Sequence, residues 1–140
     1  MTDTVLTGLT VSGAITASGG VVGNVTGNVT GSVKKAPVEV TADGAIAVPA
    51  VDTTYVITKS AAAAAMTIVN PTDVTHNGLT LTFISATAQA HTLTRATTGF
   101  NDAGASGDVA TFGGAKGDGM QITAWGGKWY VNYLTNVTLG

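Results

Sequence analysis

Histidine is the side chain best suited to acid–base catalysis near neutral pH, because its unperturbed pKa lies there. The sequence has two histidines. His76 lies in the turn-like stretch T-H-N-G and His91 at the start of a predicted strand, so we expect the first to face solvent and the second to be structural. The serines in glycine-rich sequence, Ser12, Ser18 and Ser106, lack the G-x-S-x-G pattern that presents a nucleophile between strand and helix. These residues therefore predict no hydrolase.

Carboxylates can act in pairs as acid and base, or together as ligands for a hard cation. The single glutamate, Glu39, and the lack of a paired-carboxylate motif argue against a polysaccharide-degrading enzyme. Asp102, Asp108 and Asp118 lie in glycine-rich turns that could surround a calcium ion. Their spacing does not match an EF-hand loop, and aspartate is a common turn residue for other reasons. We therefore predict no metal site, no cofactor and no catalytic residue.

Aromatic side chains near the C-terminus could stack on a carbohydrate. Trp125, Trp129 and Tyr130 lie in one predicted hairpin. Large rings also supply much of a small domain's core, since each removes about 150–250 Å² from water when buried. We expect at least one of the two tryptophans to be buried, so the residues leave both roles open.

Overall composition limits the fold and the partners. The 140 residues are 44% hydrophobic and only 10% charged, with 19 glycines, which favours β-structure. The net charge is −2 and the only adjacent basic pair is Lys34–Lys35, so we predict no nucleic-acid partner. The longest apolar run, residues 61–66, is too short to cross a membrane, and residues 1–4 lack the basic region of a secretion signal. We expect a soluble product made in a cytoplasm, with no membrane partner.

Short apolar runs divided by turn residues follow residue 37. Within 79–83 the apolar residues alternate with threonines, and His91, Leu93 and Arg95 share one face of the next strand. Regularly spaced short strands indicate a sandwich or barrel. The predicted strands are 38–40, 45–48, 55–58, 66–69, 79–84, 91–94, 109–112, 120–125 and 128–134.

Glycine pairs mark the turns between these strands. Asn77–Gly78 precedes one strand, and Gly126–Gly127 predicts a two-residue hairpin, because glycine adopts positive φ at both positions without strain. The aromatic residues around this hairpin predict that the core is centred there. The alanine-rich run 61–65 is too short to hold a helix by itself, so we expect an edge or a turn.

A repeat dominates the N-terminal part of the chain. Residues 21–33 read V-V-G-N-V-T-G-N-V-T-G-S-V, with glycine and valine each recurring every fourth residue. Three glycines in nine residues exclude a helix. We interpret the repeat as a self-associating β-structure that resembles the shafts of phage fibres, in which three chains intertwine; the other interpretation is a flexible Gly/Asn/Thr linker. In the first case the trimer contacts are Val21, Val22, Val25, Val29 and Val33.

Much of the chain beyond residue 48 resembles modules of tailed-phage virion proteins, and is similar to capsid decoration and head-fibre proteins. The runs that carry the resemblance are T-Y-V-I-T-K-S-A-A-A-A-A-M-T-I, N-G-L-T-L-T-F-I-S-A-T-A-Q-A-H-T-L-T, A-T-F-G-G-A-K-G-D-G-M-Q-I-T-A-W-G-G-K-W-Y-V and the closing N-V-T-L. The resemblance implies a trimer on the outer surface of a phage head, with one end gripping the capsid. It also implies a strand–turn–strand over 111–120 and places Trp129 and Tyr130 in the last hairpin. It assigns no catalytic residue.

Together these observations predict an all-β homotrimer with two parts. Residues 1–36 are expected to form an extended arm, and 37–140 a β-sandwich or jelly-roll-like domain. The protein is then a structural virion protein, made in the bacterial host cytoplasm, whose partners are itself and the major capsid protein. Tethering three weak arm contacts on one trimer would raise the affinity for the shell by a factor of roughly 10² to 10⁴. The residues assigned to the capsid contact are Val5, Leu6, Leu9, Val11 and Ile15.

Three other functions remain open at this point. The first is a tail-fibre or receptor-binding tip that recognises a host surface glycan through Trp125 or the loops between 102 and 118. The second is a small polysaccharide-degrading enzyme, which the single glutamate disfavours. The third is a non-viral surface module, which would usually carry a secretion signal.

Overall fold

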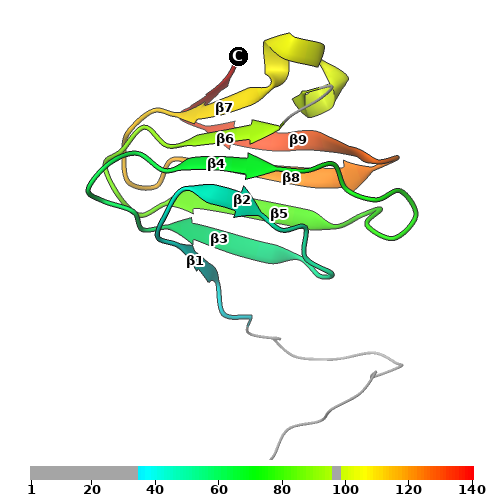
Figure 1. Ribbon diagram of the computed structural model, residues 1–140, viewed down its shortest axis with the longest axis horizontal. Helices are drawn as coiled ribbons and strands as arrows, with labels where there is room; N and C mark the ends of the chain where they lie inside the picture. The colour runs from blue at the N-terminus through cyan, green and yellow to red at the C-terminus, as the bar shows by residue number, and fades with distance from the viewer. Residues whose placement is uncertain (1–34, 96–98) are drawn as a thin grey trace, which may run out of the picture. The chain divides into compact units, whose positions relative to one another are not determined.

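The computed structural model describes residues 35–95 and 99–140. Ten strands form two five-stranded sheets, which Figure 1 shows one behind the other, with β2, β4, β6 and β7 nearer the viewer. Two short 3-10 helices, η1 (Phe100–Asp102) and η2 (Gly104–Gly107), join the sixth and seventh strands. The strands are β1 Val38–Val40, β2 Gly44–Ile46, β3 Thr53–Ile57, β4 Ala65–Ile68, β5 Thr80–Ser85, β6 Thr92–Arg95, β7 Val109–Phe112, β8 Gly119–Trp125, β9 Lys128–Thr135 and β10 Val137–Leu139.

The first six strands wind alternately between the two sheets. Sheet A has the order β1-β3-β5-β8-β9 and sheet B the order β10-β7-β6-β4-β2. Within each sheet the neighbours among β1 to β6 are parallel, whereas β7 to β10 add antiparallel pairs. In the first half of the domain the chain therefore crosses from one sheet to the other after each strand. The second half completes both sheets with antiparallel strands.

The expected all-β class is confirmed, and the two mixed sheets do not close into a barrel. Of the two forms predicted, this arrangement fits a β-sandwich better, because the two sheets of a jelly roll are antiparallel. The nine predicted strands all occur, with ends that differ by at most two residues. The sequence prediction missed β10, which starts directly after Asn136, a residue with φ of 49°.

Alternation of side chains gives the domain one core between the sheets. Leu81 and Phe83 of β5 are fully buried, as are Leu93 and Arg95 of β6, so the predicted faces of both strands are confirmed. The ring of Phe83 stacks on Tyr55 of β3 with centroids 5.0 Å apart. The core therefore runs along both sheets and is not centred on the last hairpin as predicted.

The predicted hairpin at Gly126–Gly127 is confirmed. Trp125 pairs with Lys128 across it, and the two glycines have φ of 57° and 71°. The alanine run 61–65 forms no helix; its last residue begins β4, and the side chain of Ala64 is buried. Of the hairpin's rings, only Trp129 is buried, because it faces the core beside Ala124.

Candidate functional site

We call the side of sheet A that faces away from the core the outer face. Polar and aromatic side chains of β3, β5, β8 and β9 form two straight rows across it, beside an apolar pair formed by Val56 and Ile84. The strand register aligns the first row as Thr54, Thr82, Gln121 and Tyr133. It aligns the second row as Thr80, Thr123 and Tyr130. Directly opposite residues in a sheet lie on the same side, so each row passes from hydroxyl or amide groups to a tyrosine ring on β9.

A β-bulge in β9 determines which side chains reach the outer face. Gln121 pairs with Tyr133 and Ile122 with Val131, which leaves Asn132 without an opposite residue. In a regular ladder Tyr133 would pair with Met120 and face the core, because side chains alternate along a strand. The bulge therefore turns Tyr133 outward beside Asn132, in keeping with the general use of bulges to re-aim side chains.

Hydrogen bonds join the polar side chains of the outer face into one network. The Asn132 amide nitrogen donates to Gln121 Oε1 at 3.1 Å and to Thr123 Oγ1 at 2.8 Å. Gln121 Nε2 donates to Thr82 Oγ1 at 3.2 Å, and the hydroxyls of Thr80 and Thr123 are 3.3 Å apart. An amide has two donor hydrogens and an acceptor oxygen. Among the described residues, the second hydrogen of Gln121 Nε2 and the Asn132 Oδ1 atom have no bonding partner, so both can bind a ligand.

Three aromatic rings are exposed along one side of this network. Trp125 is 65% exposed, Tyr133 47% and Tyr130 37%. Trp129 differs: its ring is buried, and its Nε1 donates to the Val69 carbonyl at 2.9 Å. Of the three residues considered for carbohydrate stacking, Trp125 and Tyr130 are thus available and Trp129 is a core residue. Sequence reasoning did not assign Tyr133 to a site, because the bulge that exposes it leaves no sequence signal.

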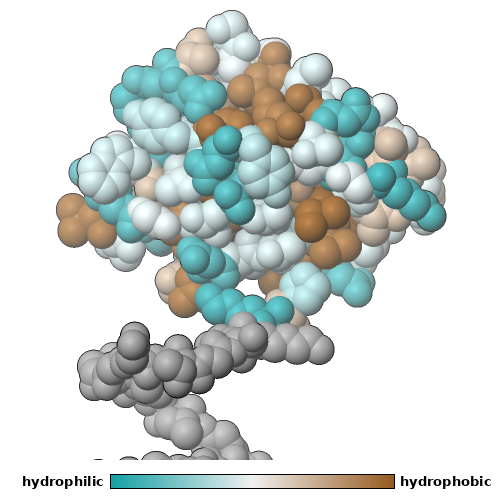
Figure 2. All heavy atoms as spheres, turned by 180° about the vertical axis from the view of Figure 1, so that it is seen from behind, coloured by the Kyte–Doolittle hydropathy of each residue, from teal (hydrophilic) through white to brown (hydrophobic). Residues whose placement is uncertain are grey.

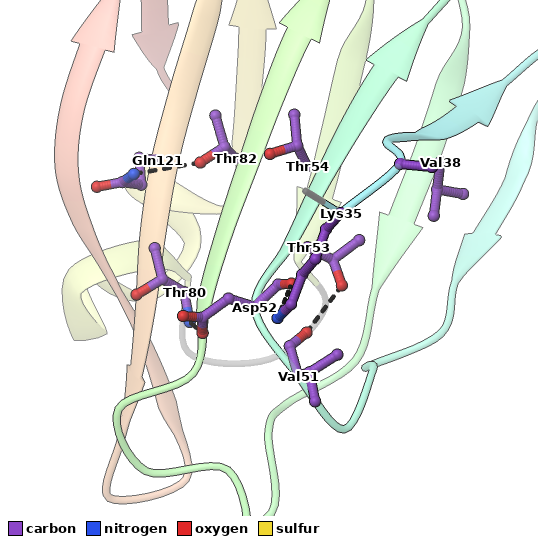
Figure 3. A pocket seen from close by; sticks show the side chains of 10 residues that line it. Lys35, Val38, Val51, Asp52, Thr53, Thr54, Thr80, Thr82 and Gln121 are labelled. Carbon is purple, nitrogen blue, oxygen red and sulfur yellow. Dashed lines mark hydrogen bonds between the residues drawn. The ribbon is translucent and has the colours of Figure 1, made fainter. Parts of the chain in front are cut away.

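A hollow of about 580 Å³ lies at the other end of the rows. Figure 3 shows the side chains that line it. Its floor is formed by outer-face residues, and its wall by the segment before β1 and the turn before β3. In that wall Lys35 Nζ donates to the Asp52 carbonyl at 3.3 Å, and Asp52 Oδ1 accepts from the Thr80 amide at 2.8 Å. Sheet A lies behind sheet B in Figure 1, so Figure 2 looks onto this side, where residues of intermediate hydropathy predominate. The lining residues are Lys35, Ala36, Val38, Val51, Asp52, Thr53, Thr54, Thr80, Thr82 and Gln121.

The two histidines hold backbone segments in place. His91 is fully buried; its Nδ1 accepts from the Ala64 amide at 2.8 Å and its Nε2 lies 2.9 Å from Thr87 Oγ1. Burial, and secondarily the charge of Lys59, lowers the pKa of His91. His76 was expected to face solvent, but it is half-buried and its Nδ1 accepts from the Thr72 amide at 2.8 Å.

The three loop aspartates have separate roles. Asp118 is buried, and its pKa is lowered mainly by the hydrogen bond from the Ala115 amide and next by the one from the Asn136 side chain, both at 2.8 Å. Asp102 forms an ion pair with Lys128 at 2.5 Å. Within residues 35–95 and 99–140, no three histidine, aspartate or glutamate side chains gather as metal ligands.

Arg95 forms a second polar cluster, at the end of β6. Its side chain is fully buried, and its guanidinium nitrogens have no hydrogen-bond partner among the described residues. Burial lowers the pKa of Arg95, and the charges of Asp102 and then Asp108 oppose that effect. One buried oxygen of Asp108 is likewise without a partner there.

The residues assigned to the trimer and to the capsid contact all lie in 1–34, outside the described residues. Those predictions, Val5, Leu6, Leu9, Val11 and Ile15 for the shell and Val21, Val22, Val25, Val29 and Val33 for the trimer, therefore stay predictions. In the part of the chain that the structure describes, no helix is long and apolar enough to span a membrane. Models of known protein families give no match to this chain, and curated protein sequences give none either.

Proposed function

We propose that the protein is a structural, non-enzymatic component of a phage virion surface, a homotrimer held on the outer capsid by residues 1–36. The domain 37–140 is then displayed outward. The resemblance to decoration and head-fibre proteins is one support. The observation that carries the proposal is that three buried side chains hold loops of the domain in place by hydrogen bonds: His91 binds the Ala64 amide, Asp118 the Ala115 amide and Trp129 the Val69 carbonyl.

This use of polar groups produces a rigid domain. A buried polar group is costly unless it is hydrogen-bonded, and the bonds of His91 and Trp129 tie segments far apart in sequence to the sheets. Trp129 and Val69, for example, are 60 residues apart. A rigid displayed domain on three tethered arms would turn weak single contacts with the major capsid protein into strong attachment, and would oppose separation of neighbouring capsid subunits.

Deletion of residues 2–20 tests the attachment. The proposal predicts that the shortened protein folds and trimerises but no longer binds empty heads of its phage, measured by co-sedimentation. The matched control is the Val69→Ala variant of the full chain, which changes an exposed side chain of the domain and should bind normally. Undiminished binding of the shortened protein would contradict the assignment of the arm.

A second candidate function is a tail-fibre or receptor-binding tip that recognises a host surface glycan. The specific observation in its favour is the exposure of Trp125, Tyr130 and Tyr133 on the outer face. Immunogold labelling of intact virions separates the two functions, because label on the head supports the first and label on the tail the second.

A further inference from the structure

Exposed aromatic rings on the outer face offer flat apolar surfaces to a ligand. Trp125, Tyr130 and Tyr133 lie on β8 and β9, on the side away from the core. Sugar rings have apolar C–H faces that stack on such side chains, and tryptophan and tyrosine join a large contact area to a polar atom. Tyrosine and tryptophan also lose little side-chain entropy on binding, having two χ angles each.

The network beside the rings is preorganised to bind hydroxyl groups. Asn132, Gln121 and Thr123 hold one another by hydrogen bonds of 2.8 and 3.1 Å, so these side chains lose little further freedom when a ligand binds. Their unused groups include both a donor, on Gln121 Nε2, and an acceptor, Asn132 Oδ1. A sugar hydroxyl is itself both donor and acceptor, and therefore matches this mixture.

Charge on the outer face favours a neutral ligand. Neither row contains a charged side chain. Glu39 of β1 pairs with the outward-facing Val56 and so lies on the same side of sheet A. The other nearby charges are Lys35 and Asp52 in the wall of the hollow, and Lys128, which is already paired with Asp102. A nucleic acid would need clustered basic side chains, and the outer face has none.

The dimensions suit a chain of sugars better than a single sugar. From β3 to β9 the face crosses three strand spacings of about 4.8 Å, or roughly 14 Å. The hollow of about 580 Å³ extends the surface at the β3 end. The aromatic rings lie at the β9 end, so a bound chain would run across the strands with stacking at one end and hydrogen bonds along its length.

From these observations we infer that the outer face of sheet A is a binding site for a neutral oligosaccharide chain. Trp125 and Tyr130 supply stacking, and Asn132 and Gln121 supply the central hydrogen bonds. Only the source of the sugar, a polysaccharide of the host surface, rests on the proposed virion function. Binding by the purified protein does not depend on attachment to a capsid, so the two proposals fail in different experiments.

A glycan array with the purified full-length chain tests the inference, followed by titration with the best neutral glycan on the array and with polygalacturonate as an acidic comparison. Because Trp129 is buried and Trp125 exposed, the change in tryptophan fluorescence should come from Trp125. We expect Trp125→Ala to weaken binding on the order of tenfold or more and Asn132→Ala by several-fold. Both residues are exposed, so both variants should fold.

Two controls isolate the outer face. Thr67→Ala changes an exposed residue of sheet B, and Val69→Ala an exposed apolar residue outside the outer face; neither should change the affinity. The inference is overturned if no neutral glycan on the array binds, if polygalacturonate binds more tightly, or if Trp125→Ala and Asn132→Ala bind as well as the unaltered protein. A change in molar mass on Trp125→Ala would also overturn it, because the face would then be a contact between copies of the chain.

Discussion

Asn132 donates a hydrogen bond to Gln121 across the β8–β9 pair, with 3.1 Å between the amide nitrogen and Oε1. Asn132 is the extra residue of the bulge, and Gln121 lies directly opposite the tyrosine that follows it. The extra residue of the β9 bulge is therefore also the residue that joins the polar network of the outer face.

This relationship predicts energetic coupling between the two side chains. Asn132→Ala and Gln121→Ala should each lower the free energy of unfolding by about 1 kcal/mol, since an intramolecular hydrogen bond contributes about that much. The double variant should lose less than the sum of the two. Urea unfolding of the four proteins measures the coupling. Pairing Asn132→Ala with the distant Thr67→Ala provides the control, for which the effects should add; strict additivity for Asn132 and Gln121 would contradict the prediction.

Buried His91 predicts a loss of stability in mild acid. Nδ1 accepts from the Ala64 amide, so Nε2 carries the hydrogen and donates to Thr87 Oγ1, whose own hydrogen goes to the Lys59 carbonyl. Protonation of Nδ1 would break the first bond, and burial lowers the pKa of the folded state below 6.5. The unfolded chain therefore takes up the proton first, and the free energy of unfolding falls as the pH drops below about 6.5.

The slope of this fall should not exceed about 1.4 kcal/mol for each pH unit. Urea unfolding of the unaltered protein and of His91→Gln between pH 7 and pH 5 measures the contribution of His91. His76 is present in both proteins, so its effect cancels. We expect a smaller slope in His91→Gln, and equal slopes would show that His91 does not cause the acid sensitivity.

The Gly126–Gly127 turn predicts a stabilising substitution. Gly126 has φ of 57°, and a Cβ atom built there contacts nothing within 4 Å. Asparagine tolerates this conformation and restricts the unfolded chain more than glycine does. Gly126→Asn should therefore raise the free energy of unfolding by up to roughly 1 kcal/mol, and Gly126→Val should lower it, because a β-branched residue is strained at positive φ. Melting temperatures that rank Gly126→Val above Gly126→Asn would contradict the positive φ of Gly126 in this turn.

Close packing of Gly119 against β5 predicts a destabilising substitution. A Cβ atom at Gly119 would lie 2.8 Å from the carbonyl oxygen of Phe83, which is backbone and cannot rotate away. Gly119→Ala should thus cost about 1–3 kcal/mol of unfolding free energy. Gly140→Ala is the matched control, since its Cβ atom would meet nothing within 4 Å. Similar unfolding midpoints for the two variants would show that β8 can shift away from β5.

Local features of the fold were predictable from the sequence where side-chain chemistry determines them. Alternation of apolar residues and threonines identified β5, and adjacent glycines identified the last hairpin. A two-residue turn also pairs Trp129 with Ala124 and Trp125 with Lys128. That pairing was enough to separate the buried tryptophan from the exposed one, although the sequence interpretation did not use it.

The winding of β1 to β6 between two sheets was not predictable in this way. Each parallel pair joins strands separated by a strand of the other sheet, and loops rather than strand residues determine that choice. The bulge at Asn132 was equally hidden, because its cause is the register between β8 and β9. Without the bulge Asn132 would still face outward, opposite Gln121, but Tyr133 would face the core. Of the site's exposed rings, Trp125 and Tyr130 could therefore be named in advance and Tyr133 could not.

The molar mass of the protein in solution tests the proposed assembly most directly. Light scattering after size exclusion should give three times 13.9 kDa for the full chain and a monomer for a chain that begins at Pro37. A full-length monomer would contradict the intertwined arm and the attachment by three tethered contacts. A trimer in both cases would place the contacts between chains in the domain instead of the valine repeat.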